Sequence, residues 1–476
     1  MNNGKFGDRM KFFLSIAVLF LTLAVSGQSG RISPVSAPAM PEVPVRAMFD
    51  EVNGYNKAKF AEYEKKKVPY SEKLRIQTER EQKQLAAKYA AATGTRANLT
   101  TDDLYYAGLL YWVSENLDRT SESLIKYLTA PEPSAEKAQT ARSIVAVIAA
   151  KQRRFGEALS MIAEYSKNAP VKLSDRTRME SEIAKAYFAE KKYAEAAEHS
   201  AAAYTAAKTV LLGSGVTQRG LDETLDTGMQ LFESNRALGN HKEADAALLD
   251  LRKTAGVVGS PSLFAYAADK LIVHMVETGR KLLAMETFLT SLIQAGKELP
   301  TKPVQDEAIQ LIKKREKQYK LLGETAPEFT GIDKWFPGTA KTLASLRGKV
   351  VLLDFWATWC GPCFDAFPSL AEWHRDHSTE GLVILGMTRY YGQGEGYSMD
   401  NASEIEFLKR FKDKHQLPYD FVVASDPTTQ QLYAATGLPT AVLIDRKGVI
   451  RYIESGTSPT RVEELREVML RLLAEK

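Results

Sequence analysis

The sequence predicts two folded regions of different class: an all-α region of helical hairpins, followed by a smaller α/β region. Between residues 46 and 322, apolar residues recur at three- and four-residue intervals, the spacing of one face of an α-helix. From Lys349 onward the pattern changes to a continuous apolar run rich in β-branched residues, which is typical of a buried strand. The only two cysteines of the chain, Cys360 and Cys363, follow that run.

Length and composition agree with a folded, multidomain protein. The chain has 476 residues, which at about 150 residues per domain suggests roughly three structural units. Hydrophobic residues make up 44% and charged residues 26%, which excludes a mostly disordered or fibrous chain. The net charge is only +4, so there is no electrostatic case for a nucleic-acid partner.

The N-terminus predicts export. Basic residues precede an apolar stretch from Phe12 to Val25, and the small residues Ser26 and Gly27 follow. This is the pattern of a signal peptide over residues 1–27, and the apolar stretch is shorter than the ~20 residues of a membrane span. We expect an exported protein in the periplasm or on the outer surface of a bacterium. A retained N-terminal anchor is the alternative.

Residues 28–45 are expected to form an extended linker. Pro34, Pro38, Pro41 and Pro44 interrupt this stretch, between Ser, Ala and Val residues. Proline at this density disfavours a helix and favours an extended, exposed tether. The helical region is therefore predicted to begin at about residue 46.

The helical region contains an internal repeat. The segments RRFGEALSMIAEY and KKYAEAAEHSAAAY share a basic pair, an aromatic residue, an acidic residue and then Ala. Aligning Ala158 with Ala196 also aligns Ala146 with Ala184, at an offset of 38 residues. Small residues at these positions let the two helices of a hairpin approach closely. A third copy is indicated around Ala244, although its upstream half departs from the pattern.

This repeat resembles the tetratricopeptide pattern of small and aromatic positions. Phe155 and Tyr193 occupy the aromatic position, and Pro170 falls where that pattern ends a repeat. The spacing is looser than the usual ~34 residues, so a plain stack of helical hairpins is the alternative. Either arrangement presents a concave surface, which predicts a protein partner for this region.

The predicted chemistry lies in the last third of the chain. The apolar run from Val350 to Leu353 delivers Trp359 and Cys360 to its carboxyl end, and Pro362 is suited to the first turn of a following helix. Free N–H groups at a helix start stabilise a thiolate, so Cys360 is the expected nucleophile. A metal half-site is the alternative for two cysteines at this spacing, but no second pair of ligands completes it, so we expect no metal.

The motif WCGPC after this strand resembles the thioredoxin superfamily, over about residues 323–476. The segment GLPTAVLID at residues 437–445 is similar to that family's cis-proline loop and following strand, and Pro368 is similar to the proline that kinks its active-site helix. The resemblance implies a reaction in which Cys360 forms a mixed disulfide with the substrate and Cys363 resolves it. It also implies substrate contacts by the following residues: Trp359, Gly361, Pro362, Leu438 and Pro439.

Asp354 lies within the predicted strand, six residues before Cys360. A carboxyl group buried beneath a dithiol should have a raised pKa and could take the proton of Cys363. Thioredoxin is similar in having Asp at this place. The alternative is an aspartate at the strand end that only caps the strand or is solvated.

The opening segment from Glu324 and the long insertion over residues 388–421 resemble the TlpA-like and ResA-like branch of the superfamily. That branch often has Asn at the place of Asp354 and Glu at the place of Ala366, where this chain has Asp365 beside the alanine. The difference implies that Asp354 takes over the handling of protons.

Together these features predict an exported thiol-disulfide oxidoreductase of the protein-disulfide reductase type. Its only redox group would be the Cys360–Cys363 disulfide, with no further cofactor. Its partners would be a disulfide-bearing exported protein and a membrane thiol donor of electrons, recruited in part by the helical region. The alternative is an interaction scaffold whose C-terminal region has only an auxiliary redox role. The sequence does not indicate the oligomeric state.

Overall fold

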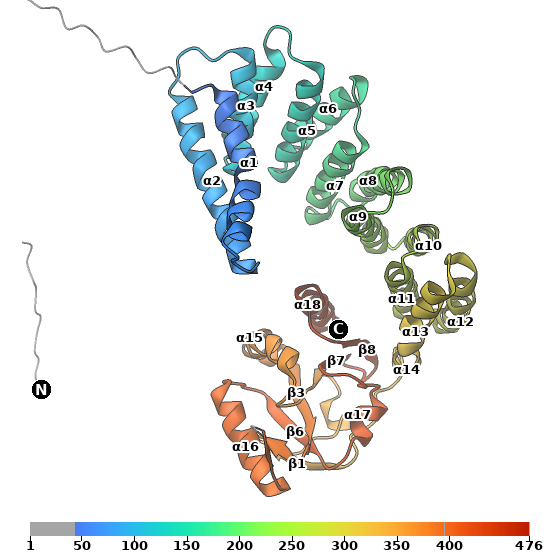
Figure 1. The fold of residues 1–476 in the computed structure, drawn as a ribbon. Coiled ribbons are helices and arrows are strands. Elements are labelled where there is room, and N and C mark those ends of the chain that lie inside the picture. The colour runs from blue at the N-terminus through green and yellow to red at the C-terminus, as the bar shows by residue number, and fades with distance from the viewer. Residues whose placement is uncertain (1–42, 395, 476) are drawn as a thin grey trace, which may run out of the picture.

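A computed structural model describes residues 43–394 and 396–475. The predicted signal peptide and nearly all of the predicted linker lie outside these residues, so both stay predictions. Within the described residues, no helix combines the length and apolarity that crossing a bilayer requires. The helices form an open arc, and the α/β region adjoins the end of that arc that holds α10–α14 (Figure 1).

The helical region begins at Val45 and ends at Leu321. Its helices are α1 (Val45–Lys65), α2 (Glu72–Gly94), α3 (Thr101–Val113), α4 (Leu117–Thr129), α5 (Ala135–Lys151), α6 (Phe155–Lys167), α7 (Leu173–Ala189), α8 (Tyr193–Ser214), α9 (Gln218–Ala237), α10 (His241–Val258), α11 (Pro261–Glu277), α12 (Lys281–Glu298), α13 (Lys302–Lys314) and α14 (Glu316–Leu321). The last helical stretch of this region is divided at Arg315 into α13 and α14.

Five successive hairpins share the same turn. In each, three residues link the two helices and the middle one has positive φ: Glu115, Arg153, Lys191, Gly239 and Gly279. The amide of the residue that follows donates to the carbonyl oxygen five residues before it, at 2.8–3.0 Å. This is the 6→1 bond of a Schellman motif, which ends the first helix of each pair.

The position five residues after each of these turn residues is completely buried. It is occupied by Thr120, Ala158, Ala196, Ala244 and Ala284. The three copies predicted from sequence therefore occupy equivalent places, and two further hairpins, α3–α4 and α11–α12, belong to the same series. The hairpin stack is a feature of the structure, whereas its likeness to tetratricopeptide repeats stays a prediction.

The α/β region is a mixed six-stranded sheet with the strand order β1-β6-β3-β2-β7-β8. Strands β2, β3 and β6 are parallel to one another, whereas β1, β7 and β8 run antiparallel to their neighbours. The strands are β1 (Ile332–Phe336), β2 (Val350–Phe355), β3 (Leu382–Arg389), β6 (Asp420–Ala424), β7 (Thr440–Ile444) and β8 (Ile450–Ser455), with a separate pair β4 (Gln393–Gly394) and β5 (Tyr397–Ser398). The helical elements are η1 (Ala344–Leu346), η2 (Gly361–Asp365), α15 (Phe367–His377), η3 (Ser378–Glu380), α16 (Asn401–Lys414), α17 (Thr428–Leu432) and α18 (Pro459–Ala474). The predicted fold class, an all-α region followed by a thioredoxin-like α/β region, is confirmed.

The two regions share one hydrophobic core. A continuous apolar cluster extends from Tyr204 and Leu271 in the helices to Leu322, and on to Val351 and Ile453 in the sheet. Because the cluster crosses the junction, burying these side chains stabilises both regions together.

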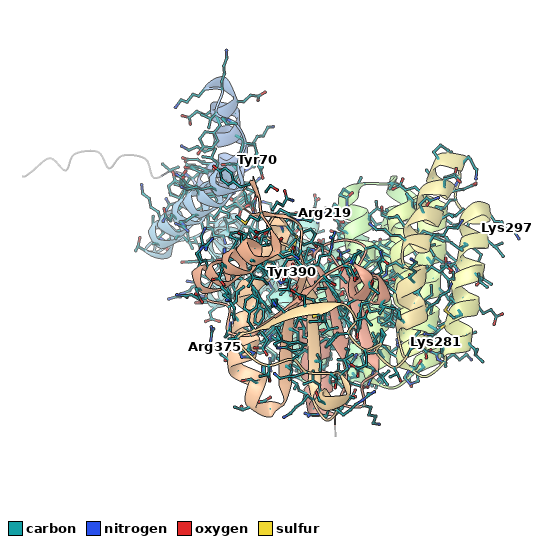
Figure 2. All side chains as sticks on the ribbon, turned by 90° about the horizontal axis from the view of Figure 1, so that it is seen from below. Tyr70, Arg219, Lys281, Lys297, Arg375 and Tyr390 are labelled. Atoms are coloured by element: carbon teal, nitrogen blue, oxygen red, sulfur yellow. A yellow bond between two sulfur atoms is a disulfide. The ribbon has the colours of Figure 1, made fainter. Side chains whose placement is uncertain are left out.

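Hydrogen bonds close the same junction. The Gly323 amide donates to the Ile450 carbonyl at 2.8 Å, and Arg315 Nη1 donates to the Ile453 carbonyl at 3.2 Å, so helical residues cover the edge strand β8. On the helical side of the junction, Lys281 of α12 (Figure 2) donates to the Tyr319 and Lys320 carbonyls at the end of α14, at 2.9 and 3.0 Å. The α/β region is thus held against the end of the arc.

Candidate active site

Cys360 and Cys363 form a disulfide at the carboxyl end of β2. Cys360 is the N-cap of η2, and Cys363 lies within that element. Cys360 is 5% exposed and Cys363 is 1% exposed, so Cys360 is the more accessible of the two residues. This supports Cys360 as the thiol that meets a substrate, since access is one of the requirements for thiol–disulfide exchange.

The helix after the cysteines differs from the prediction. Pro362 opens a short 3-10 element, and the α-helix α15 begins only at Phe367. Pro368 therefore lies in the first turn of α15 and does not kink the middle of a longer helix. Proline is suited to that position because a first-turn N–H has no partner within the helix.

An exposed aromatic group stands beside the disulfide. Trp359 is 55% exposed, although it directly precedes a buried cysteine. Its ring meets the edge of Tyr391 at 5.3 Å, and the Arg389 guanidinium lies 4.3 Å from the Tyr391 ring centre. An exposed indole that packs against another ring is suited to contact with a protein substrate, and the substrate contact of Trp359 stays a prediction.

The predicted proline loop lies next to the disulfide turn. The Leu438–Pro439 peptide bond is cis, and the Gly456 amide donates to the Pro439 carbonyl at 2.7 Å. Thr457 then donates its hydroxyl to the Pro362 carbonyl at 3.0 Å. Thr457 was not predicted from sequence, because a single threonine after a strand carries no recognisable signal.

Asp354 lies in the middle of the sheet, opposite Gly386 of β3 and Ala441 of β7. Only 3% of the residue is exposed, and burial raises the pKa of its carboxyl group to about 7. Its Oδ2 atom has no hydrogen-bond partner among the described residues. The alternative of a capping or solvated aspartate is therefore wrong, whereas its part in proton transfer stays a prediction.

A small cavity separates Asp354 from the helices above the sheet. It has a volume of about 30 Å³, and Ala366 and Pro439 also line it. The neighbouring Asp365 is exposed to solvent. Of the two residues at this place, the alanine therefore faces the buried acid.

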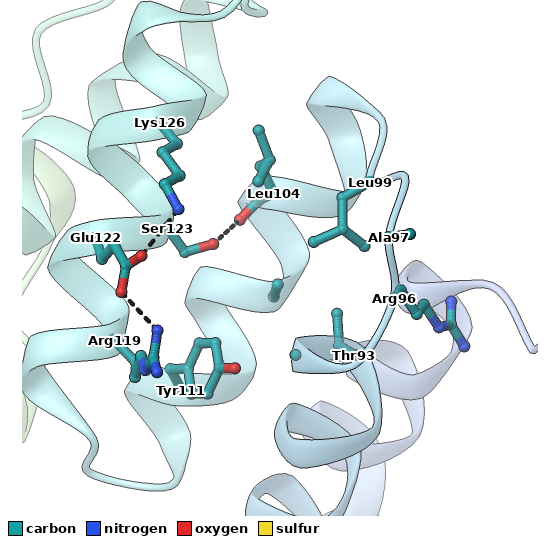
Figure 3. Close-up of a pocket in the computed structure, with 12 residues that line it drawn as sticks. Thr93, Arg96, Ala97, Leu99, Leu104, Tyr111, Arg119, Glu122, Ser123 and Lys126 are labelled. Carbon is teal, nitrogen blue, oxygen red and sulfur yellow. Dashed lines mark hydrogen bonds and ion pairs between the residues drawn. The ribbon is translucent and has the colours of Figure 1, made fainter.

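A larger pocket in the helical region contains no comparable buried acid. It lies between α2, α3 and α4, with a volume of about 360 Å³ (Figure 3). Three of its charged side chains bind one another, since Glu122 contacts both Lys126 and Arg119 at 2.8 Å. Among the residues that the structure describes, no group of His, Cys, Asp and Glu could hold a metal ion.

Comparisons with known proteins agree with this geometry. The Redoxin family matches residues 321–469. The thiol-disulfide oxidoreductase ResA of Geobacillus thermodenitrificans is 30% identical over 143 residues, which are 30% of this chain and 74% of that protein. The thioredoxin-like protein YneN of Bacillus subtilis is 28% identical, over 28% of this chain and 72% of its own length.

Among solved structures, a thioredoxin-like superfamily protein is 27% identical, with a TM-score of 0.27, and the match covers 32% of this chain and 97% of that one. The family match covers the part of the chain that holds the disulfide, Asp354 and the cis-proline loop. Through this C-terminal region, the chain belongs to the ResA-like family of thiol-disulfide oxidoreductases.

Proposed function

We propose that the protein is an exported reductase of protein disulfides, in which Cys360 attacks the substrate and Cys363 resolves the mixed disulfide. The observation that carries this proposal is the buried Asp354 on the strand that leads to the cysteine pair, where burial raises the pKa of its carboxyl group to about 7. A carboxylate that takes up a proton near neutral pH is suited to deprotonating Cys363 as that thiol attacks. The dipeptide Gly361–Pro362 between the cysteines supports the reducing direction, as the resemblance to thioredoxin implies.

We further propose that the helical region holds the partner protein. A cavity of about 740 Å³ lies between the arc and α18, where Phe188, Met229 and Tyr266 provide apolar surface and Glu464 and Glu467 provide charge. A mixed lining of this kind is typical of protein-binding surfaces. Export and a membrane thiol donor belong to the same proposal, since a reductase outside the cytosol needs a supply of electrons.

The proposal is tested by the reduction potential of the full chain without residues 1–27. The Cys360–Cys363 pair is equilibrated with glutathione buffers, and the oxidised fraction is measured by alkylation. We expect a potential closer to thioredoxin's (about −270 mV) than to that of a strong periplasmic oxidant (about −120 mV). A value near the oxidant would overturn the proposed direction.

Insulin reduction by the same protein provides the activity assay. Turnover should require both cysteines and a thiol donor such as dithiothreitol. A protein whose cysteine pair is reducing but which cannot reduce insulin would favour the scaffold alternative, in which the redox role is auxiliary.

A further inference from the structure

Strand register places a second carboxyl group in line with Asp354. Asp354 of β2 is opposite Ala441 of β7, and Ala441 is opposite Glu454 of β8. Residues directly opposite one another on neighbouring strands point to the same face of the sheet. The two acids therefore point to one face, with only an alanine methyl group between them.

The space left by this alanine is the small cavity described above. Asp354, Ala441 and Glu454 all line it, and Leu370 of α15 and Leu465 of α18 close it from above. At about 30 Å³ it can hold one or two water molecules, because a water needs roughly 10–15 Å³ of such volume and at least two polar partners. The unpaired Oδ2 atom of Asp354 and the Glu454 carboxyl group provide those partners.

Glu454 reaches from this cavity to the junction with the helical region. Its Oε2 atom lies 3.0 Å from Arg315 Nη1, and its Oε1 atom lies 3.6 Å from Arg461 Nη2. The Glu454 side chain is 20% exposed, whereas the whole of Asp354 is 3% exposed. Glu454 is therefore the more accessible of the two acids.

Opposing influences act on the pKa of Glu454. Burial raises the pKa of Glu454, and the nearby Arg315 opposes that shift. The other titratable or charged groups near the pair are Asp269 and Lys270 on the side of Glu454, and Tyr419 and the cysteine pair on the side of Asp354. Tyr452, Glu454 and Arg461 also line the cavity with Asp354, and of these three only Glu454 is a carboxyl group.

We propose that Glu454 is the residue through which Asp354 exchanges its proton with solvent, by way of water in the cavity that Ala441 leaves open. In the resolving step the Cys363 thiol gives its proton to the Asp354 carboxylate. The Cys363 thiolate attacks the Cys360 sulfur of the mixed disulfide, forming the Cys360–Cys363 bond and releasing the substrate sulfur as a thiolate, which takes a proton from solvent. Asp354 then passes its proton through the water to Glu454 and on to solvent.

This inference rests on the proposed function only for the direction of the reaction, in which the cysteine pair is oxidised by the substrate. Asp354 must exchange a proton whether the cysteine pair is being oxidised or reduced. An oxidising potential would therefore overturn the proposed direction and leave the role of Glu454 standing.

The test compares single-turnover oxidation of the reduced full chain by insulin from pH 5.5 to 9, in the wild type and in Glu454→Gln. We expect Glu454→Gln to be three- to tenfold slower at pH 7, with an altered pH profile and a KM within twofold of the wild type. Glu463→Gln is the matched control, because it removes an exposed carboxylate from α18. Its rate should change by less than 1.5-fold.

Combining variants separates this role from a structural one. If Glu454 acts through Asp354, the double variant Asp354→Asn, Glu454→Gln should be no slower than Asp354→Asn alone, within twofold. Ala441→Val, which fills the cavity and keeps both carboxyl groups, should slow the reaction as Glu454→Gln does. It also serves as the test should Glu454→Gln fail to fold. A wild-type rate and pH profile in these variants, or losses that multiply in the double variant, would overturn the proposal.

Discussion

The two cysteines are chemically alike but differently placed. Cys360 caps η2 and adjoins the exposed Trp359, whereas Cys363 is enclosed within the same element. Thiol–disulfide exchange requires access to the attacking sulfur. We therefore expect the two residues to take different steps of the exchange.

We predict that Cys360→Ser abolishes insulin reduction, whereas Cys363→Ser accumulates a mixed disulfide with the substrate. The first variant lacks the attacking thiol, and the second lacks the thiol that resolves the intermediate. Non-reducing electrophoresis after acid quenching would show the adduct. Equal trapping by both variants would contradict this assignment of roles.

Asp354 should make stability depend on pH. In the folded protein its carboxyl group keeps a proton up to about pH 7, whereas in the unfolded chain it loses the proton near its ordinary pKa of 3.8. Between these values the folded state binds the extra proton, so the free energy of unfolding falls as pH rises. Burial of the Asp354 carboxyl group therefore lowers the free energy of unfolding by its full amount above about pH 7, and it has no such effect below about pH 4.

We predict that Asp354→Asn raises the free energy of unfolding at pH 8 by up to about 4 kcal/mol, and that the gain vanishes at pH 4. Guanidinium denaturation followed by tryptophan fluorescence measures this, since four of the five tryptophans follow residue 323. Asp365→Asn, at an exposed carboxyl group, is the control and should change stability by less than about 0.5 kcal/mol. A gain that does not depend on pH would contradict the role of burial.

The candidate site residues that lie in or near a local motif could be predicted from the sequence. The residue proposed from strand register, Glu454, could not. Cys360, Cys363 and Asp354 lie within one strand–turn segment, so their proximity could be predicted. Glu454 is one charged residue among several in an edge strand, about a hundred residues later in the chain. Its alignment with Asp354 depends on the pairing of β7 with both β2 and β8, which the sequence does not state.

At the scale of the elements, the hairpin turn and the buried position five residues later define the repeat. Three of these positions hold alanine within a recognisable pattern and were predicted. Thr120 was missed because it is not an alanine, and Ala284 because the residues before it differ from the other copies. Gly108 provides the small residue of its hairpin, since a Cβ atom there would lie 2.5 Å from Leu124.

We predict that Ala158→Leu lowers the free energy of unfolding by about 1–3 kcal/mol, because the added side chain has no space between packed helices. Ala163→Leu on the same helix is the matched control. That residue is exposed, so its effect should be within about 0.5 kcal/mol. Urea denaturation followed by circular dichroism measures both, and equal effects would show that the position is not tightly packed.

For the whole molecule, ion pairs join the arc to α18. Lys270 of α11 lies 2.8 Å from Glu464, and Glu277 of the same helix lies 2.9 Å from Arg471. All four side chains lose part of their exposure at this junction. Such partly buried pairs contribute more than exposed ones, because water screens them less.

We predict that Glu464→Lys destabilises the protein by about 1–3 kcal/mol and that adding Lys270→Glu recovers at least half of the loss. The single variant places two cations together, and the double variant restores the pair with its charges exchanged. A double-mutant cycle by guanidinium denaturation measures the coupling. Glu406→Lys, at the exposed Glu406–Lys409 pair of α16, is the control and should cost less than about 0.5 kcal/mol.

The apolar core is divided along the arc, and this has a consequence for how the molecule loses structure. One cluster serves α1–α5, a second serves α5–α8, and a third begins at Tyr204 and continues into the sheet. In a linear array each unit depends on its immediate neighbours. Unfolding should therefore begin at α1 and α2 and proceed hairpin by hairpin, with the disulfide region last. The end of the arc at α1 and α2 should therefore open to a bulky partner while the α/β region, with the cysteine pair, keeps its structure.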